Sequence, residues 1–528
     1  MAVDLIRRKI VISRDFADEE TQLLMEGDII VPDVKPDIAY ILQTYSKAIL
    51  TRVETTNDRV SFSGSLFIKL LYMSKGPDSR VYSIEHVAPI DDYINIPGID
   101  SSMWVDVGIE IENIDYQIVN DRKVNYKAII EISVYVIVNE EHDVVVDIEG
   151  IPENQMVKYP IVLNRPIIRK DDRISIKDEV VIPHGKPSIQ ELLQVNMAIS
   201  NQEYKVLNDK INVMGEIAVT VLYRGDDDDS VIEFVEYEIP FNGHIDVPGI
   251  TEDMFADVRL SLRDDHAQVR TDEDGEDRII DLEATMAVFA RVSKIDEIDV
   301  LEDVYLINQD LLIHRNKIVY PRLVSRNKNQ ASIKEVVKLE EDSPDILQIF
   351  NISGKVITDD VRVLEDKVVV EGAIELDILY IAESDESPIY SFNTVIPFKQ
   401  TIDTKGSEPG MDVDVGIDID YISFNMLSSD EIEVRVMLTF NTRVIEMMDA
   451  SLITDIEIRP IEPDILEQMP SITVYTVQEG DSLWKIAKRY NTTIDEIAEV
   501  NGMPEPYDIS PGQKLLILKK NMLEEVLN

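Results

Sequence analysis

Alternating apolar and polar residues run through most of the sequence, and residues 411–420 show the pattern most clearly. This segment reads Met-Asp-Val-Asp-Val-Gly-Ile-Asp-Ile-Asp. Successive side chains of a strand point to opposite faces, so the pattern predicts a β-strand with one buried and one wet face. Segments around Asp106 and Asp257 keep the same buried face. The predicted buried residues are Val105, Val107, Ile109 and Ile111 in the first, Ala256, Val258, Leu260 and Leu262 in the second, and Val413, Val415, Ile417 and Ile419 in the third.

The polar faces of these three strands differ in charge. The first carries Asp106, Glu110 and Glu112, and the third carries Asp412, Asp414, Asp418 and Asp420. The second reads Asp257, Arg259, Ser261, Arg263. We therefore predict that Arg259 and Arg263 mark the second segment as an exposed interaction point.

These strands belong to a longer repeated pattern. Pro36, Pro187 and Pro344 are each followed after 28 residues by a glycine, Gly64, Gly215 and Gly372. A tyrosine follows 8 residues later, at Tyr72, Tyr223 and Tyr380, and an aspartate 34 residues after that, at Asp106, Asp257 and Asp414. A period near 150 residues is too long for a solenoid unit and predicts three tandem domains.

Turn signals complete the prediction of the fold class. Pro97–Gly98, Pro248–Gly249 and Pro409–Gly410 separate period-two strands, as in antiparallel sheets. The sequence therefore predicts a mainly β protein with three tandem β-sandwich or barrel-like repeat domains and short helices. Residues 36–42 are the best helix candidate, because proline is well tolerated in a first helical turn.

The repeats predict domain boundaries. We expect repeat domains at 1–158, 159–310 and 311–450, followed by a semi-rigid linker at 451–471, where three prolines fall between Arg459 and Pro470. A small domain is expected at 472–520, and a C-terminal tail at 521–528.

The small domain is predicted to be a βααβ unit. Leu483, Ile486, Ala487 and Tyr490 recur at the spacing of a buried helical stripe. Thr493 and Glu496 form a capping-box pattern that predicts the start of a second helix. Strands are expected before the first helix and within residues 509–517.

The motifs Tyr-Thr-Val-x-x-Gly-Asp-Ser-Leu-Trp-x-Ile-Ala and Ile-x-Pro-Gly-Gln-x-Leu of this domain resemble the LysM family. The resemblance implies a groove for N-acetylglucosamine-containing glycans between the first strand–helix loop and the second helix–strand loop. That groove would comprise Gly480, Asp481, Ser482 and Leu483 together with Asp508, Ile509, Ser510 and Pro511. From the residues alone, Asp481 is equally well explained as a helix N-cap, and Leu483 and Ile509 as core. Trp484 lies off the apolar stripe and is predicted to be a surface anchor.

Charge restricts the partners of the chain. Its 528 residues include 51 Lys+Arg and 102 Asp+Glu, for a formal net charge of −51, and contain no cysteine. This balance disfavours phosphate backbones and anionic membranes. No apolar stretch reaches the roughly 20 residues that span a bilayer. No secretion signal is recognised, and the absence of cysteine excludes disulfides, so a cytoplasmic location is expected.

Few residues are arranged for chemistry. The six histidines show no metal-ligand spacing, and neither a phosphate-binding loop nor a nucleophile elbow occurs. Acidic residues are so numerous that two of them could form a catalytic carboxylate pair. The acidic clusters at 226–229 and 272–277 are candidate calcium sites, although neither has the ligand spacing of an EF-hand and both fit hairpin tips better. We expect no enzyme activity, cofactor or metal.

The repeats themselves resemble the SPOCS domain through Lys-Pro-Asp-Ile, Gly-x-Leu-x-Ile-x-Leu-Leu-Tyr and Val-Asp-Val-Gly-Ile-Glu-Ile. SPOCS repeats followed by LysM look like clostridial spore coat morphogenetic proteins of the SipL type. This resemblance implies a scaffold made in the mother cell and recruited to the forespore surface by a coat-basement ATPase of the SpoIVA type, with LysM as the docking module. The alternative is a protein that binds cell-wall glycan, and a carboxylate-dependent glycan hydrolase ranks last.

Overall fold

The computed structural model describes residues 4–76, 80–152, 155–226, 232–307, 309–339, 343–382, 389–460 and 470–518. Each repeat contains six strands. In the first they are β1 (Asp4–Ile30), β2 (Ile38–Thr56), β3 (Arg59–Ser74), β4 (Val81–Asn95), β5 (Trp104–Asn120) and β6 (Lys123–Glu149). The second has β7 (Met156–Val181), β8 (Ile189–Leu207), β9 (Lys210–Gly225), β10 (Ile232–Asp246), β11 (Phe255–Thr271) and β12 (Asp277–Val304). The third has β13 (Gln309–Lys338), β14 (Ile346–Leu364), β15 (Lys367–Ala382), β16 (Ile389–Asp403), β17 (Asp412–Met426) and β18 (Glu431–Pro460).

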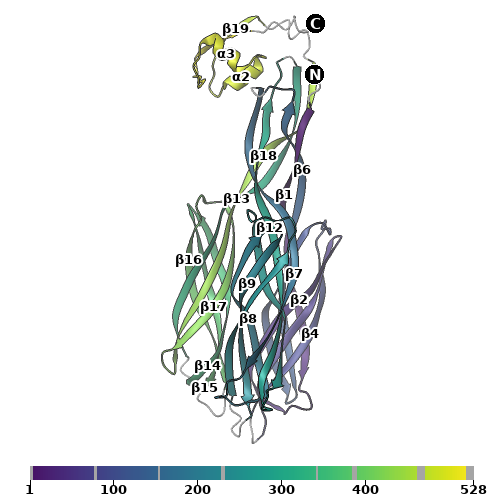
Figure 1. Ribbon diagram of the computed structural model, residues 1–528, viewed down its shortest axis with the longest axis vertical. Coiled ribbons are helices and arrows are strands. Elements are labelled where there is room, and N and C mark those ends of the chain that lie inside the picture. Colours follow the sequence, from purple (N-terminus) through teal and green to yellow (C-terminus); the bar gives the residue numbers. More distant parts are fainter. Residues whose placement is uncertain are drawn as a thin grey trace.

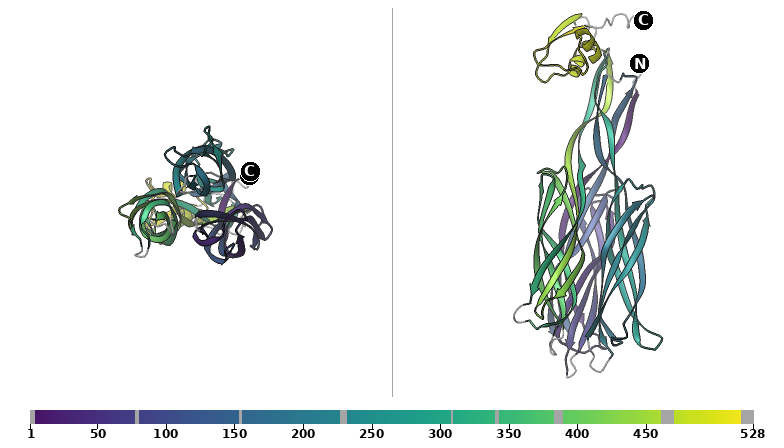
Figure 2. Two further views of the ribbon diagram at one scale, coloured as in Figure 1. Left: turned by 90° about the horizontal axis from the view of Figure 1, so that it is seen from below. Right: turned by 60° about the vertical axis from the view of Figure 1, so that its left-hand side comes forward.

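Every repeat folds into two antiparallel three-stranded sheets that share one core. In the first repeat the sheets have the orders β1-β6-β5 and β2-β3-β4, and the other two repeats follow the same plan. β2 lies beside β5, as β8 lies beside β11 and β14 beside β17, so the paired sheets curve into barrels (Figure 2). The predicted buried faces of β5, β11 and β17 line these cores. The expected mainly β, barrel-like fold is confirmed.

The spacing of the repeat motif has a structural cause in each copy. The hydroxyls of the fully buried Tyr72, Tyr223 and Tyr380 donate to the carbonyls of Pro36, Pro187 and Pro344, at 2.9, 3.1 and 2.9 Å. These bonds tie the loop before β2, β8 or β14 to the end of the neighbouring strand β3, β9 or β15.

The repeated glycine faces a close backbone approach. A Cβ on Gly64 would lie 2.1 Å from the carbonyl oxygen of Ile49, and one on Gly372 would lie 2.3 Å from that of Ile357. Both positions lie beside a bulge in the neighbouring strand, β2 or β14. Only glycine fits there without moving the backbone.

The Pro-Gly turns occupy equivalent positions in the first two repeats but not in the third. The amides of Gly98 and Gly249 donate to the carboxylates of Asp58 and Asp209 at 2.6 and 2.7 Å. In the third repeat the equivalent donor is Gly406, at 2.7 Å from Asp366. Pro409–Gly410 is a separate turn in the same loop.

Two local predictions are wrong. Residues 36–42 form no helix, because Ile38 already begins β2, which pairs with β3 from Ile38 onward. Residues 451–460 do not begin the linker, because they continue β18 and pair with the start of β13. In the part of the chain that the structure describes, both α-helices lie in the C-terminal domain, not in the repeats.

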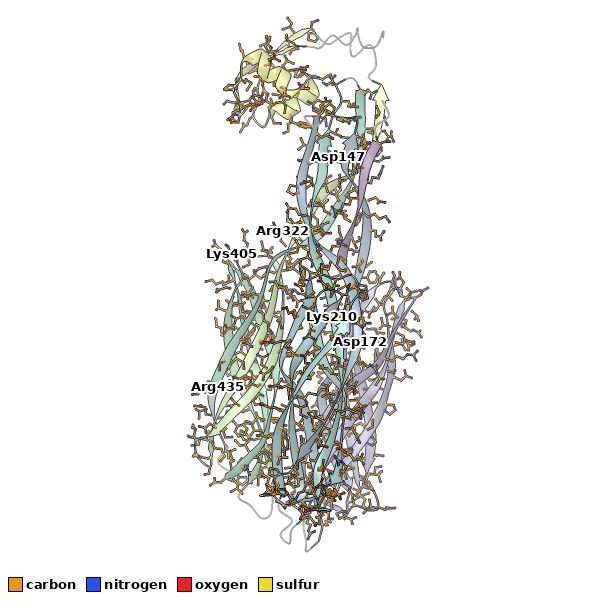
Figure 3. The ribbon with its side chains drawn as sticks, viewed as in Figure 1. Asp147, Asp172, Lys210, Arg322, Lys405 and Arg435 are labelled. Atoms are coloured by element: carbon orange, nitrogen blue, oxygen red, sulfur yellow. The ribbon has the colours of Figure 1, made fainter. Side chains whose placement is uncertain are left out.

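The three barrels stand side by side around a common axis, and their longest strands extend beyond them as a stalk (Figures 1 and 2). In the stalk, β1 pairs with β6, β7 with β12, and β13 with β18. Asp147 of β6 lies on this stalk, whereas Arg435 of β18 lies on the third barrel (Figure 3). Aliphatic residues from all three repeats fill the stalk, including Ile10, Leu163 and Leu452. The opposite end of the bundle has a second shared core, which includes Leu71, Leu222 and Phe350.

The C-terminal domain caps the stalk (Figure 1). Its elements are β19 (Ile472–Thr476), α2 (Leu483–Arg489), α3 (Ile494–Asn501) and β20 (Lys514–Leu518), and β19 pairs with β20. Thr493 and Glu496 form the predicted capping box of α3. The βααβ prediction is therefore confirmed.

Candidate functional site

The first loop of the expected glycan groove is ordered by its own hydrogen bonds. The Asp481 carboxylate accepts from the Tyr475 hydroxyl at 2.6 Å and from the Gln478 amide at 2.8 Å. These two donors, the hydroxyl first, lower the pKa of Asp481. Ser482, rather than Asp481, is the N-cap of α2, and its side chain accepts from the Lys485 amide. In its ionised form Asp481 therefore holds the first loop in place through these two hydrogen bonds.

The second loop begins at the same end of the sheet. Val477 exchanges backbone hydrogen bonds with the turn after this loop: its amide donates to Gln513 at 2.9 Å, and its carbonyl accepts from Gly512 at 2.8 Å. The Ser510 amide donates to the Gln513 side chain at 3.0 Å. These bonds join the bases of the two loops.

The groove residues divide into exposed and buried sets. Gly480, Asp508, Ser510 and Pro511 are exposed, and Asp481 and Ser482 are half-buried. Leu483 is only 6% exposed, and Ile509 packs against the same core. The exposed set can contact a ligand, whereas Leu483 and Ile509 support the loops from beneath.

Trp484 is not a free surface anchor. Its indole Nε1 donates to Asp303 at 3.0 Å, and its ring meets that of Tyr305 edge-on, with 4.9 Å between centroids. Lys488 pairs with the same Asp303 carboxylate at 2.6 Å. The tryptophan therefore fastens the C-terminal domain to the end of β12 in the stalk.

Two residues of this attachment were missed in the sequence. Asp303 and Tyr305 lie where the second repeat ends, and the Tyr305 hydroxyl donates to the Thr492 carbonyl at 2.9 Å. Burial raises the pKa of Tyr305 to about 12, so the hydroxyl stays protonated as a donor. The sequence feature that could have indicated this contact is an aromatic residue, Tyr305, placed just beyond the last strand of the second repeat.

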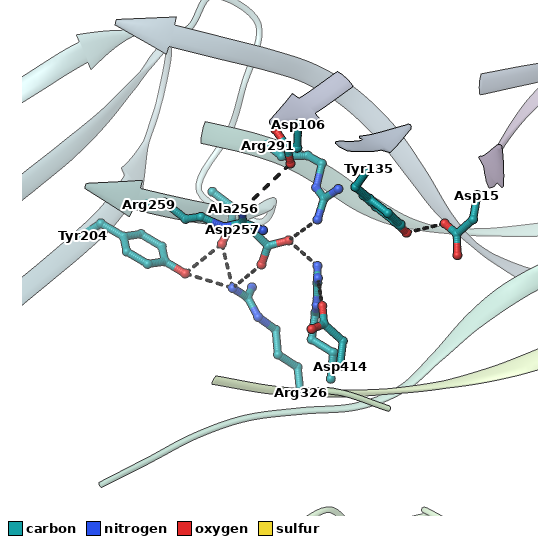
Figure 4. Close-up of polar contacts among 11 residues, drawn as sticks. Asp15, Asp106, Tyr135, Tyr204, Ala256, Asp257, Arg259, Arg291, Arg326 and Asp414 are labelled. Carbon is teal, nitrogen blue, oxygen red and sulfur yellow. Dashed lines mark hydrogen bonds and ion pairs between the residues drawn. The ribbon is translucent and has the colours of Figure 1, made fainter. Parts of the chain in front are cut away.

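A second site lies on the axis between the barrels, where the repeated aspartates converge (Figure 4). Asp257 is contacted by three arginines: Arg443, Arg326 at 3.3 Å and Arg291 at 3.5 Å. Arg443 also bridges to Asp414. Because Arg326 and Arg443 come from the third repeat, this cluster joins the second and third barrels.

The arginines that distinguish the second repeat also face inward. Arg259 lies 4.0 Å from Asp106 of the first repeat, and Arg263 donates to the Leu50 carbonyl at 2.6 Å. The expected exposure therefore fails for Arg263, which is half-buried, and holds for Arg259, whose side chain is 67% exposed toward the cavity. This polar face meets the neighbouring barrel, not an outside partner.

Of the two acidic segments that are candidate calcium sites, the second is a hairpin connection. Residues 272–276 join β11 to β12, and the Asp272 carboxylate accepts from the amides of Asp274 and Glu276. Residues 227–229 lie outside the described residues. Over the described ranges, no cluster of His, Asp or Glu is arranged to hold a metal ion. Within the same ranges, no helix has the length and apolarity to cross a membrane.

Comparison with known proteins identifies the domains. The SipL SPOCS domain model matches residues 37–119, 188–269 and 345–427, one match in each barrel, and the LysM model matches 475–518. SPOCS and LysM domains are binding modules without catalytic groups. No solved structure matches the chain.

Curated relatives match only through the LysM region. The N-acetylmuramoyl-L-alanine amidase sle1 of Staphylococcus epidermidis is 52% identical over 48 residues, which is 9% of this chain and 14% of that protein. The uncharacterized lipoprotein YgeR of Escherichia coli is 46% identical over 43 residues, or 8% of this chain and 17% of that protein. The chain thus spans less than a fifth of either relative. Its three matches to the SipL SPOCS domain, followed by a match to LysM, instead give the chain the domain architecture of SipL-type proteins.

Proposed function

We propose that this chain is a non-enzymatic scaffold for spore coat assembly, with the LysM domain as its docking module. The observation that carries the proposal is the architecture. Three SPOCS barrels form one bundle through shared cores, and the LysM domain sits at the far end of their common stalk. This arrangement keeps the docking module away from the barrels, whose outer faces are left for other coat components.

The partner proposed for the docking module is a coat-basement ATPase of the SpoIVA type, which would recruit the chain from the mother-cell cytoplasm to the forespore surface. Three observations limit where it can bind. One side of the LysM domain is occupied by Asp303 and Tyr305, Leu483 is buried, and Ile509 is half-buried against the same core. The exposed rim at Gly480, Asp508, Ser510 and Pro511 is open.

A pull-down from sporulating cells tests this recruitment. We expect the full chain to recover the ATPase and a chain lacking 471–528 to lose it. The full-length variant Ser510→Trp should weaken recovery by crowding the rim, whereas Glu499→Trp, a matched change at an exposed position of α3, should not. Equal recovery with and without 471–528 would contradict the proposal.

Glycan binding is the second candidate, supported by the LysM match and by the exposed, hydrogen-bonded loops. A shallow rim of carboxylate, hydroxyl and backbone groups suits the hydroxyl and acetamido groups of an N-acetylglucosamine polymer. Cosedimentation of the full chain with peptidoglycan and with spore cortex should show retention that Ser510→Trp reduces. If neither material retains the wild-type chain, the groove serves protein docking alone.

A further inference from the structure

The axis of the bundle holds an open cavity of about 1850 Å³ whose walls come from all three repeats. Its walls include residues of β5 and β6 in the first repeat, β11 and β12 in the second, and β17 and β18 in the third. Charged side chains line it, and its cations are all arginines. In a chain with twice as many acids as bases, this concentration of guanidinium groups is unusual.

Four of the eight arginines in the described lining pair with carboxylates of the cavity wall, and Arg14 and Arg52 pair with Glu140 and Glu54 outside it. Arg443, Arg326 and Arg291 surround Asp257, and Arg169 lies 3.5 Å from Asp106 and 3.7 Å from Asp171. The pairs of Arg326 and Arg443 with Asp257 join the second and third barrels, and that of Arg169 with Asp106 lies between the first and second.

Arg173 of β7 and Arg263 of β11 are the exception. Among the residues that the structure describes, neither side chain forms an ion pair with a carboxylate. Arg263 has one hydrogen bond, to the neutral carbonyl of Leu50 at the edge of the first barrel. Both arginines line the cavity, where β7 and β11 flank β12.

The two arginines lie on one face of the same sheet, because Arg173 is opposite Ala287 of β12, and Ala287 is opposite Ser261 of β11, two residues from Arg263. Burial first, and then the charge of Arg173, lower the pKa of Arg263, while Asp171 opposes the shift only in part. Like charges that share a half-buried site destabilise each other unless a counter-charge enters. Arg173 is exposed, so an ion from solution can reach the pair.

We propose that Arg173 and Arg263 form a binding site for a small multivalent oxyanion at the cavity wall between the first and second barrels. Guanidinium groups bind phosphate and carboxylate oxygens in pairs of parallel hydrogen bonds, and two adjacent guanidiniums suit an anion with more than one charge. The bound anion bridges β7 and β11 and stabilises the side of the bundle where Arg263 meets the first barrel. The site is separate from the LysM groove and does not depend on the proposed function.

Isothermal titration of the full chain with sodium pyrophosphate, at ionic strength kept constant with NaCl, tests the proposal. We expect saturable binding of one anion per chain and a concentration-dependent rise in the melting temperature. Each of Arg173→Gln and Arg263→Gln should weaken binding about tenfold, as expected for the loss of one charge-assisted contact. A parallel titration with citrate distinguishes a phosphate from a carboxylate ligand, and saturable binding of either supports the site.

Arg270→Gln is the matched control, because Arg270 lies on the same strand as Arg263 but outside the cavity, where it pairs with Glu179 and Asp281. It should bind pyrophosphate like the wild type. If Arg263→Gln disturbs folding, Arg173→Gln still tests the proposal. Arg173 is exposed, and its side chain donates no hydrogen bond within the described chain. The proposal is overturned if neither anion binds saturably, or if Arg173→Gln binds as tightly as Arg270→Gln.

Discussion

The axis-facing sheets of the first and second repeats have the same strand order but opposite charge. At one level of the first repeat, Asp106, Tyr135 and Asp18 lie side by side on β5, β6 and β1. At the same level of the second, the row is Asp257, Arg291 and Arg169 on β11, β12 and β7. The third repeat matches the second, with Asp414, Arg443 and Arg326.

This difference explains how three acidic barrels can share an axis. Three copies of the first repeat's row would place six carboxylates around one line, and like charges at such short range repel strongly. The arginines of the other two repeats convert that repulsion into attraction, and their positions specify which barrel meets which. The departure of the second repeat from the repeated pattern is therefore a requirement of the assembly.

The largest expected effect comes from Asp257, the carboxylate shared by three arginines. The Asp257 side chain is 23% exposed and its three partners are 13–31% exposed, so their charges are only partly screened. We expect Asp257→Asn to lower the free energy of unfolding by about 3 kcal/mol, because removing one member of a largely buried ion cluster leaves the others uncompensated. Urea unfolding measures the loss.

The matched control is Asp412→Asn, at an exposed cavity position two residues from Asp414, which should change stability little. Equal losses in the two variants would mean that the arginine cluster does not hold the barrels together.

A second prediction concerns what the repeats share. Tyr72→Phe, Tyr223→Phe and Tyr380→Phe each remove one hydroxyl that donates to a proline carbonyl. Each should cost about 1 kcal/mol in the free energy of unfolding, the typical value of a buried hydrogen bond. Because the three bonds have the same geometry, the three losses should agree. A loss confined to one repeat would show that the barrels differ in more than charge.

The third prediction returns to the first repeat. Among the basic side chains that the structure describes, Arg169 lies 3.5 Å and Arg259 4.0 Å from Asp106. Both separations exceed the length of a charge-assisted hydrogen bond, so Asp106→Asn should cost less than Asp257→Asn, about 1 kcal/mol in the free energy of unfolding. Asp106→Asn and Asp257→Asn change equivalent positions in the same way. If their unfolding energies fall equally, the charge of the surrounding row is not what distinguishes the two repeats.

The sequence predicts local features well and relations between repeats poorly. The alternation of apolar and polar residues identified the buried faces of β5, β11 and β17. The repeated spacings of 28, 8 and 34 residues singled out the tyrosines and glycines, whose hydrogen bonds and close backbone contacts the structure then shows. The helix expected at 36–42 failed because a proline before an apolar run is equally compatible with the start of a strand. In this protein the segment is a strand because its residues pair with β3.

The orientation of the polar faces could not be predicted in the same way. Alternation shows that Arg259 and Arg263 lie opposite the barrel core, but it cannot show whether that side meets solvent or another barrel. The stalk was missed for a related reason. The alternating residues at the start of β1 and the end of β18 bury their apolar faces only when strands from all three repeats come together. Trp484 likewise lies against Asp303, 181 residues away in the chain.

The smallest expected effect concerns the attachment of the LysM domain, to which one carboxylate of the second repeat contributes. Burial opposes ionisation of Asp303, but the hydrogen bonds from Lys488 and Trp484 outweigh it, so the pKa of Asp303 is lowered. A carboxylate with a lowered folded-state pKa contributes its full stability above the unfolded pKa, near 3.9, and loses it as the pH falls through the folded value. The LysM domain should therefore stay attached near neutral pH and loosen below about pH 4.

The fluorescence of Trp484 reports this change directly. In a Trp104→Phe background Trp484 is the single remaining tryptophan, and its emission should shift to longer wavelength as the indole leaves Asp303 and Tyr305. Asp303→Asn in the same background removes the titrating group, so its emission should already be shifted at pH 7 and should change little over the same acid range. An acid-induced shift that Asp303→Asn retains would assign the transition to the barrels, because Asp303 is the carboxylate that both Trp484 and Lys488 contact.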